Sequence, residues 1–206
     1  MQSTASVFKP EEEDRIPNRA GVYAFLYNPF DRSRMGLYRG KHEPAQIAAA
    51  KIALKIKLQR LKELQDDLTL SAEFTVRRNY NNSVDRFACD IPRSKDHELW
   101  GDIHDLDDKS FLEYLEMAEQ AFLFLPPLYC GMTVKQGLHS RYLQHRQNYT
   151  GEKSGTLGGR LAQSLISWSD IRFMCVPISG HSEKEASVRV LERHLINLLG
   201  PVLSVK

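Results

Sequence analysis

Val22-Tyr23-Ala24-Phe25-Leu26-Tyr27 is the stretch that decides the fold, because an uninterrupted apolar and aromatic run of this length predicts a buried strand. The turn signal Pro17-Asn18 precedes this run, and Asn28-Pro29 ends it. Gly21 stands directly before it, so the strand begins with the sequence Gly21-Val22-Tyr23. We therefore expect an early strand that belongs to the core.

Size and composition are typical of a globular protein. The chain has 206 residues, of which 42% are hydrophobic and 26% charged, enough for one sizeable domain or a domain with a large insertion. No apolar run reaches about 18 residues, so we expect no membrane span, and Met1–Phe8 lacks the pattern of a signal peptide. The three cysteines are far apart and show no zinc-type or disulfide-type spacing. A reducing, cytoplasmic setting is the expectation.

Apolar periodicity in the first half predicts a helix, a hairpin and a second helix. The helix from Pro44 to about Leu68 carries apolar residues that repeat every seven positions, interrupted by Lys57. We expect this stripe to pack on its own domain, with a dimer seam as the alternative. Alternation predicts a hairpin of strands over residues 73–78 and 84–91, and a helix over residues 110–120 follows.

The second half predicts two further strands and two helices. In chain order we expect a strand-like stretch over 122–130, interrupted by Pro126-Pro127, then a helix over 138–149, a glycine-rich loop over 155–159, a strand over 171–176 and a helix over 184–199. We place Val188, Leu191, Leu195 and Leu198 on the inner stripe of the last helix. The glycine-rich loop lacks the Gly-Lys-Ser/Thr ending of a phosphate-binding loop, so we expect no nucleotide site there.

Charge is unevenly distributed although the net charge is only +2. The stretch from Tyr129 to Gln163 has a single acidic residue, Glu152, against five cations: Lys135, Arg141, Arg146, Lys153 and Arg160. A basic segment suits a polyanionic substrate, although a solvated mixed-charge surface has the same composition. Residues 81–120 are strongly acidic.

Three polar residues of the second half are candidates for chemistry. Arg141 and His145 lie four residues apart on an expected helix, so their side chains share one face. An arginine there can grip a phosphate, and a histidine one turn away can accept or relay a proton. Glu192 lies at the edge of an apolar face, where a carboxylate needs a partner: a metal ion such as magnesium, or Arg189 in a salt bridge.

Two tyrosines complete the pattern, in Gly21-Val22-Tyr23 and Tyr129-Cys130-Gly131. With Arg141, His145 and Glu192 behind them in this order, the half-motifs resemble the GIY-YIG nuclease family over residues 17–28 and 122–204. The sequence departs from the family pattern in three ways: the half-motifs are far apart, Cys130 replaces an isoleucine, and Ser204 stands where asparagine is usual. Tyr38 is a rival for the second tyrosine, but no arginine and histidine follow it at the right spacing, so we prefer Tyr129.

The resemblance implies an α+β fold with a small, mainly antiparallel sheet flanked by helices. Residues 1–206 would form a single nuclease domain, in which residues 41–121 are a helix-hairpin-helix insertion for DNA recognition or dimer contacts. The implied activity is hydrolysis of double-stranded DNA by an endonuclease that depends on magnesium or manganese, most like the restriction-enzyme branch of the family, with a homodimer as a possible assembly. The alternatives are a structure-specific repair or recombination nuclease, and a catalytically silent nucleic-acid-binding or scaffold protein.

The resemblance also implies roles for the site residues. Glu192 would hold the metal ion, Arg141 would bind the scissile phosphate, Tyr23 would help activate the attacking water, Tyr129 would orient phosphate or water, and His145 would assist proton transfer. Additional DNA contacts are expected from the basic residues of the same region, Lys135, Arg146, Lys153 and Arg160.

Overall fold

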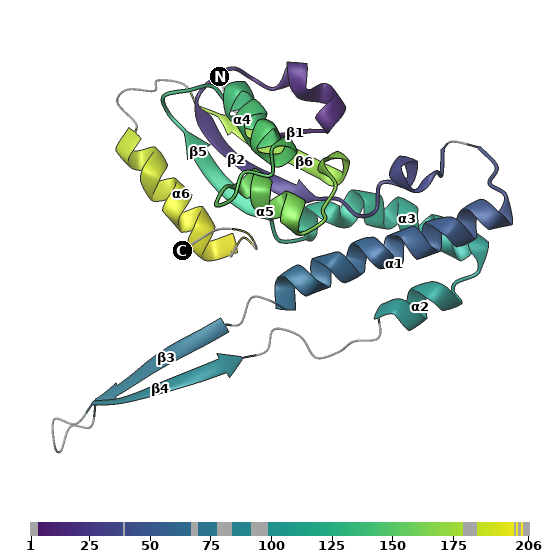
Figure 1. Ribbon diagram of the computed structural model, residues 1–206, viewed down its shortest axis with the longest axis horizontal. Helices are drawn as coiled ribbons and strands as arrows, with labels where there is room; N and C mark the ends of the chain where they lie inside the picture. The colour runs from purple at the N-terminus through teal and green to yellow at the C-terminus, as the bar shows by residue number, and fades with distance from the viewer. Residues whose placement is uncertain are drawn as a thin grey trace.

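A four-stranded antiparallel sheet with helices on both faces forms the centre of the molecule (Figure 1). The computed structural model describes residues 4–38, 40–66, 70–77, 84–91, 99–178, 185–199, 201 and 203. The strand order is β1 (Ser6–Phe8), β6 (Ile171–Pro177), β2 (Gly21–Tyr27) and β5 (Tyr129–Thr133). The expected α+β class with a small antiparallel sheet is therefore confirmed.

Strand β2 is central and is buried along its whole length, as the apolar run predicts. Alternate side chains of a strand point to opposite faces, and here both faces are covered. Tyr23, Phe25 and Tyr27 pack into one hydrophobic cluster, whereas Ala24 and Leu26 pack into a second. The sheet is thus the middle layer of three.

Two helices follow each other over the face that carries Tyr23. They are α4 (Leu138–Thr150) and α5 (Leu157–Gln163), which contribute Tyr142 and Leu161 to the first cluster. The opposite face packs against α1 (Pro44–Asp66) and α3 (Asp108–Ala121), which contribute Leu54, Phe111 and Leu115, each 0% exposed, to the second cluster. The last helix, α6 (Glu185–Leu199), runs beside the edge strand β5 (Figure 1).

The seven-residue stripe of α1 packs on its own domain, as expected. Four of its described apolar members are buried, Ile47, Ala50, Leu54 and Leu61, and Leu64 is half-buried against the first cluster. Leu68 lies outside the described residues. Lys57 interrupts the stripe because its ammonium lies 2.7 Å from the carboxylate of Asp170, and the two side chains are 13% and 6% exposed.

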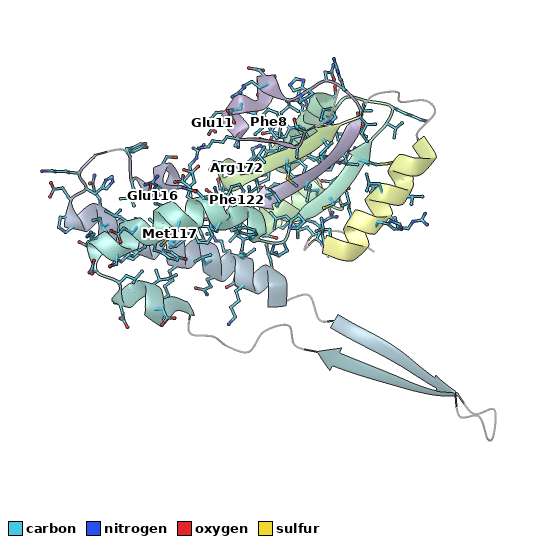
Figure 2. All side chains as sticks on the ribbon, turned by 180° about the vertical axis from the view of Figure 1, so that it is seen from behind. Phe8, Glu11, Glu116, Met117, Phe122 and Arg172 are labelled. Atoms are coloured by element: carbon cyan, nitrogen blue, oxygen red, sulfur yellow. The ribbon has the colours of Figure 1, made fainter. Side chains whose placement is uncertain are left out.

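Between β2 and β5 the chain also forms η2 (Arg32–Met35), a hairpin of β3 (Leu70–Arg77) with β4 (Val84–Ile91), and the short helix α2 (Leu99–Asp105). The hairpin projects away from the sheet and its flanking helices (Figure 1). Arg172 of β6, labelled in Figure 2, is 2% exposed. Its guanidinium donates to the carboxylate of Asp31, just before η2. No helix of the described ranges is long and apolar enough to cross a membrane.

Three sequence expectations for the second half are wrong in detail. Residues 122–130 do not form one strand: Phe122–Phe124 is a 3-10 helix, and β5 begins at Tyr129, beyond the prolines that lack a backbone donor. Residues 155–159 are not all loop, because Thr156 caps α5 by accepting a hydrogen bond from the Gly159 amide at 3.1 Å. Leu191, placed on the inner stripe of α6, is 42% exposed.

The N-terminal segment contains structure that its sequence did not predict. The chain begins with the edge strand β1 and continues through the 3-10 helix η1 (Pro10–Arg15). The acidic residues of η1 form ion pairs, Glu11 with Arg34 and Glu13 with Arg146. These two ion pairs therefore attach the N-terminal segment to η2 and to α4.

Candidate active site

The two half-motifs lie on neighbouring antiparallel strands. In the register of β2 with β5, Gly21 faces Thr133 and Tyr23 faces Gly131. The rings of Tyr23 and Tyr129 are 6.1 Å apart between centroids. Tyr38, the rival second tyrosine, lies in no strand and is 71% exposed at a different pocket. The structure therefore places Tyr129, and not Tyr38, beside Tyr23.

Gly131 is required because the Tyr23 side chain lies directly over it. A Cβ atom added at Gly131 would be 2.7 Å from the Tyr23 hydroxyl and 2.7 Å from a ring carbon of Tyr129. Any larger residue would push one of the two rings away. The glycine of the second half-motif thus sets the position of the first tyrosine.

Tyr23, Arg141 and His145 form one hydrogen-bonded group. Arg141 Nε donates to the Tyr23 hydroxyl at 3.1 Å, and the same hydroxyl is 3.0 Å from His145 Nε2. Because an arginine can only donate, the Tyr23 oxygen accepts from Arg141, whereas the direction of the bond between Tyr23 and His145 depends on the histidine tautomer. His145 Nδ1 is buried and has no hydrogen-bond partner among the described residues, so a proton on this atom would be unpaired.

Burial keeps the tyrosine and the histidine uncharged. Burial, and then the nearby Tyr129, raise the pKa of Tyr23 far above its ordinary value, although Arg141 acts against this. Burial, and then the nearby cations Arg141 and Arg160, lower the pKa of His145 to about 3. At neutral pH the group therefore contains a neutral phenol that is hydrogen-bonded to a neutral imidazole.

The start of α4 is fixed by the loop before β2. The amides of Leu138 and His139 donate to the carbonyls of Arg19 and Pro17, at 2.8 and 3.3 Å. These bonds satisfy donors that the first turn of a helix leaves unpaired. The loop that leads into Tyr23 therefore also sets the position of the helix that carries Arg141 and His145.

Glu192 approaches the same site from α6. One oxygen of its carboxylate accepts a hydrogen bond from the backbone amide of Met132 at 3.1 Å, on the open edge of β5. Burial raises the pKa of Glu192, while the Met132 amide, Arg189 and Arg141 act to lower it. The carboxylate is thus half-buried and lies within the electrostatic influence of two guanidinium groups.

An open pocket lies between these elements. Its volume is about 330 Å³, and it is lined by Met132, Thr133, Val134, Lys135, Gln136, Arg141 and Arg189. Arg141 is held at its wall by a second bond, from Nη1 to the Gln144 side chain at 2.6 Å. Sequence reasoning missed Gln144 as a positioning residue and treated Arg189 only as an ion-pair partner of Glu192. The sequence signal for both was helical spacing: Gln144 lies three residues after Arg141, and Arg189 lies three residues before Glu192.

Of the four residues expected to bind DNA, only Lys135 is among those that line this pocket. Lys135 lines the pocket, and Lys153 is exposed in the turn before α5. Arg146 is paired with Glu13, and Arg160 donates to the carbonyl of Gly155 at 3.2 Å with its Nε atom buried. Of the four, the pocket brings Lys135 alone beside Arg141.

The site has few groups that could hold a metal ion. Across the described ranges, no cluster of three or more histidine, cysteine, aspartate and glutamate side chains has metal-binding geometry. An ion here would therefore rely on Glu192, water and substrate. Comparison of the chain with protein-family models, curated proteins and solved structures gives no match.

Proposed function

We propose that the protein is a magnesium- or manganese-dependent endonuclease that hydrolyses double-stranded DNA, of the sequence-specific restriction type. One observation carries this proposal. Arg141 is fixed between Tyr23 and Gln144 and lines a pocket together with Met132, whose backbone amide donates to Glu192. A phosphate-binding cation, a carboxylate and a proton-relaying pair thus converge from three elements, in the order that resembles the GIY-YIG family.

The carboxylate fits a hard divalent ion. Magnesium in proteins is commonly held by one or two carboxylates, with water and substrate phosphate as its other ligands. One oxygen of Glu192 is engaged by the Met132 amide, and burial raises its pKa, so a nearby dication would favour its charged form. When bound, the ion would neutralise phosphate charge and lower the pKa of a coordinated water.

The remaining steps belong to the side chains. Arg141 would hold the scissile phosphate and stabilise the charge that develops on it. Tyr23 would help to activate the attacking water through the hydroxyl that Arg141 and His145 hold, and His145, hydrogen-bonded to that hydroxyl, would assist the proton transfer. Tyr129 would orient the phosphate or the water. His145 therefore acts through Tyr23.

The first test compares cleavage by the parent protein and by Glu192→Gln on a panel of plasmid and phage DNA with magnesium. Glutamine can still accept the Met132 hydrogen bond but lacks the charge, so a loss of activity on the order of a hundredfold would report metal binding and not misfolding. Glu116→Gln is the matched control, because this exposed carboxylate lies on α3, away from the site (Figure 2).

The outcomes of this test separate the candidate functions. Discrete bands from the parent and from Glu116→Gln, absent with EDTA, would support a sequence-specific nuclease. Cleavage confined to flaps or branched DNA would favour the repair-type alternative. Equal cleavage by parent and Glu192→Gln would refute the assignment of Glu192, and DNA binding without any cleavage would favour the silent binding protein.

For residues 41–121 we propose a divided role. Helices α1 and α3 belong to the core, because Leu54, Phe111 and Leu115 cover one face of the sheet. The hairpin β3–β4 projects away from that core (Figure 1). We assign DNA recognition or dimer contacts to the hairpin and not to the whole segment.

A further inference from the structure

We infer that Arg189 of α6 and Lys135 of the loop after β5 hold a second DNA phosphate, next to the one held by Arg141. This inference rests on the proposed function, since it assumes that nucleic acid enters the pocket. It adds Arg189 as a substrate-positioning residue that neither the sequence pattern nor the resemblance indicates.

The charge of the pocket is the first reason. Its three charged lining residues are all cations, and they come from the β5–α4 loop, from α4 and from α6: Lys135, Arg141 and Arg189. Among the described side chains that line it, none is a carboxylate. Cations from separate elements that converge on one hollow are suited to an extended polyanion.

The size of the pocket is the second reason. The volume of about 330 Å³ far exceeds the roughly 10–15 Å³ that one water molecule needs in the same measure. Among its lining residues, Arg141 is tied to Tyr23 and Gln144, whereas Lys135 and Arg189 are exposed. The hollow therefore has room for a phosphate beyond the one that Arg141 would hold.

The placement of Arg189 on its helix is the third reason. It lies three residues before Glu192, so both side chains project from the same side of α6. Its charge influences the Glu192 carboxylate, yet it also lines the pocket. Arg189 can therefore contact a phosphate while it remains close to the carboxylate.

The test measures the salt dependence of duplex binding, which does not require cleavage. A fluorescent DNA duplex would be titrated in EDTA with the parent, Arg189→Gln, Lys135→Gln and the control Arg193→Gln. Arg193 is an exposed arginine one turn further along α6 and does not line the pocket. Each lost phosphate contact lowers the slope of log K against log salt by about 0.9.

We expect a reduced slope for Arg189→Gln and Lys135→Gln, an unchanged slope for Arg193→Gln, and recovery in Arg189→Lys, which retains a positive charge. Parent-like slopes for both pocket variants, or an equal reduction in the Arg193 control, would overturn the inference. Urea unfolding of each variant would show that the effect is not loss of fold.

A second measurement locates the phosphate once the cut has been mapped. A duplex with a neutral methylphosphonate beside the scissile phosphate should weaken binding of the parent, and should not weaken binding of Arg189→Gln further. Additive losses would show that Arg189 contacts something else. If the parent binds DNA but never cleaves it, the proposed function fails while the salt-slope result still decides this inference.

Discussion

Tyr23 is the residue on which the proposed chemistry depends most. Its hydroxyl meets Arg141 on one side and His145 on the other, and its ring stacks on Phe173 with centroids 5.4 Å apart. The ring belongs to the hydrophobic core, whereas the oxygen belongs to the polar site. Removing the oxygen alone therefore separates the two roles.

Tyr23→Phe should fold but lose at least about a hundredfold in cleavage rate, because the hydroxyl that would help to activate the water is removed. Stability should fall by about 1–3 kcal/mol, since two buried nitrogen atoms lose a partner. Tyr142→Phe is the matched control: this buried hydroxyl accepts from Trp168 Nε1 at 3.0 Å and does not contact the site. Similar rates in the two variants, at similar stability, would exclude Tyr23 from catalysis.

His145 predicts a pH dependence of stability. The pKa of His145 is lowered to about 3 in the folded state. Between about pH 6.5 and pH 3 this histidine is therefore protonated in the unfolded chain but neutral in the folded chain. The stabilisation is complete above about pH 6.5 and is lost as the pH falls. From pH 7 to pH 5 the parent should lose about 2 kcal/mol of unfolding free energy more than His145→Gln does, measured by urea denaturation. Parallel pH profiles of the two proteins would contradict the buried neutral histidine.

At the scale of elements, ion pairs attach the helices and the N-terminal segment to the sheet. Glu13 of η1 pairs with Arg146 of α4, and Lys57 of α1 pairs with Asp170 at the start of β6. The carbonyl of Lys57 also accepts from the Tyr27 hydroxyl at 3.3 Å. Lys57 thus joins α1 to the ends of both central strands.

Lys57→Met should destabilise the fold by about 3 kcal/mol, because it leaves the buried Asp170 carboxylate without its cation. Lys55→Met is the control, since Lys55 is exposed two residues earlier on the same helix; its unfolding free energy should stay within about 0.5 kcal/mol of the parent. The double variant Lys57→Met, Asp170→Asn should recover part of the loss. Equal urea midpoints for the two single variants would mean that the ion pair contributes nothing.

The local sequence pattern predicted most helices and strands, because apolar periodicity and turn residues such as glycine and proline are short-range signals. It placed β2, the stripe of α1, α4 and β6 within a few residues of where they are. It failed where tertiary contact decides. The sequence placed Gly158 in a loop, but Gly158 is part of α5. The residue is a glycine because a Cβ atom there would lie 2.5 Å from the backbone carbonyl of His145 on α4. Gly158 thus permits close packing of α5 on α4, and Gly159 permits close packing of α5 on the turn at Lys153.

The candidate site could be predicted in part. The spacing of Arg141 and His145 predicted a shared helix face, but the adjacency of Tyr23 and Tyr129 came only from the resemblance, because no local signal pairs strands so far apart in sequence. The ion pair between Arg146 and Glu13 could not be predicted for the same reason. Long-range pairing is set by the whole core and not by the sequence near each residue.

At the scale of the whole molecule, residues 41–121 have two parts: helices α1 and α3 belong to the core, whereas the hairpin β3–β4 projects from it (Figure 1). Deleting the entire segment would remove Leu54, Phe111 and Leu115, which are 0% exposed, from one face of the sheet. Such a loss costs several kcal/mol for each large side chain. A deletion that tests recognition must therefore spare α1 and α3.

A deletion that spares α1 and α3 replaces residues 67–98 with a glycine-serine linker. The hairpin lies apart from the sheet (Figure 1), and loop closure changes the free energy only slowly with length, so the shortened protein should keep the cooperative urea transition of the parent. We expect it to cleave DNA with relaxed site preference, because the hairpin and not the catalytic group would read the sequence. Glu192→Gln in the shortened chain should abolish that cleavage and show that the same site acts. An unchanged band pattern would remove recognition from the hairpin, whereas a lost unfolding transition would make the hairpin part of the folding unit.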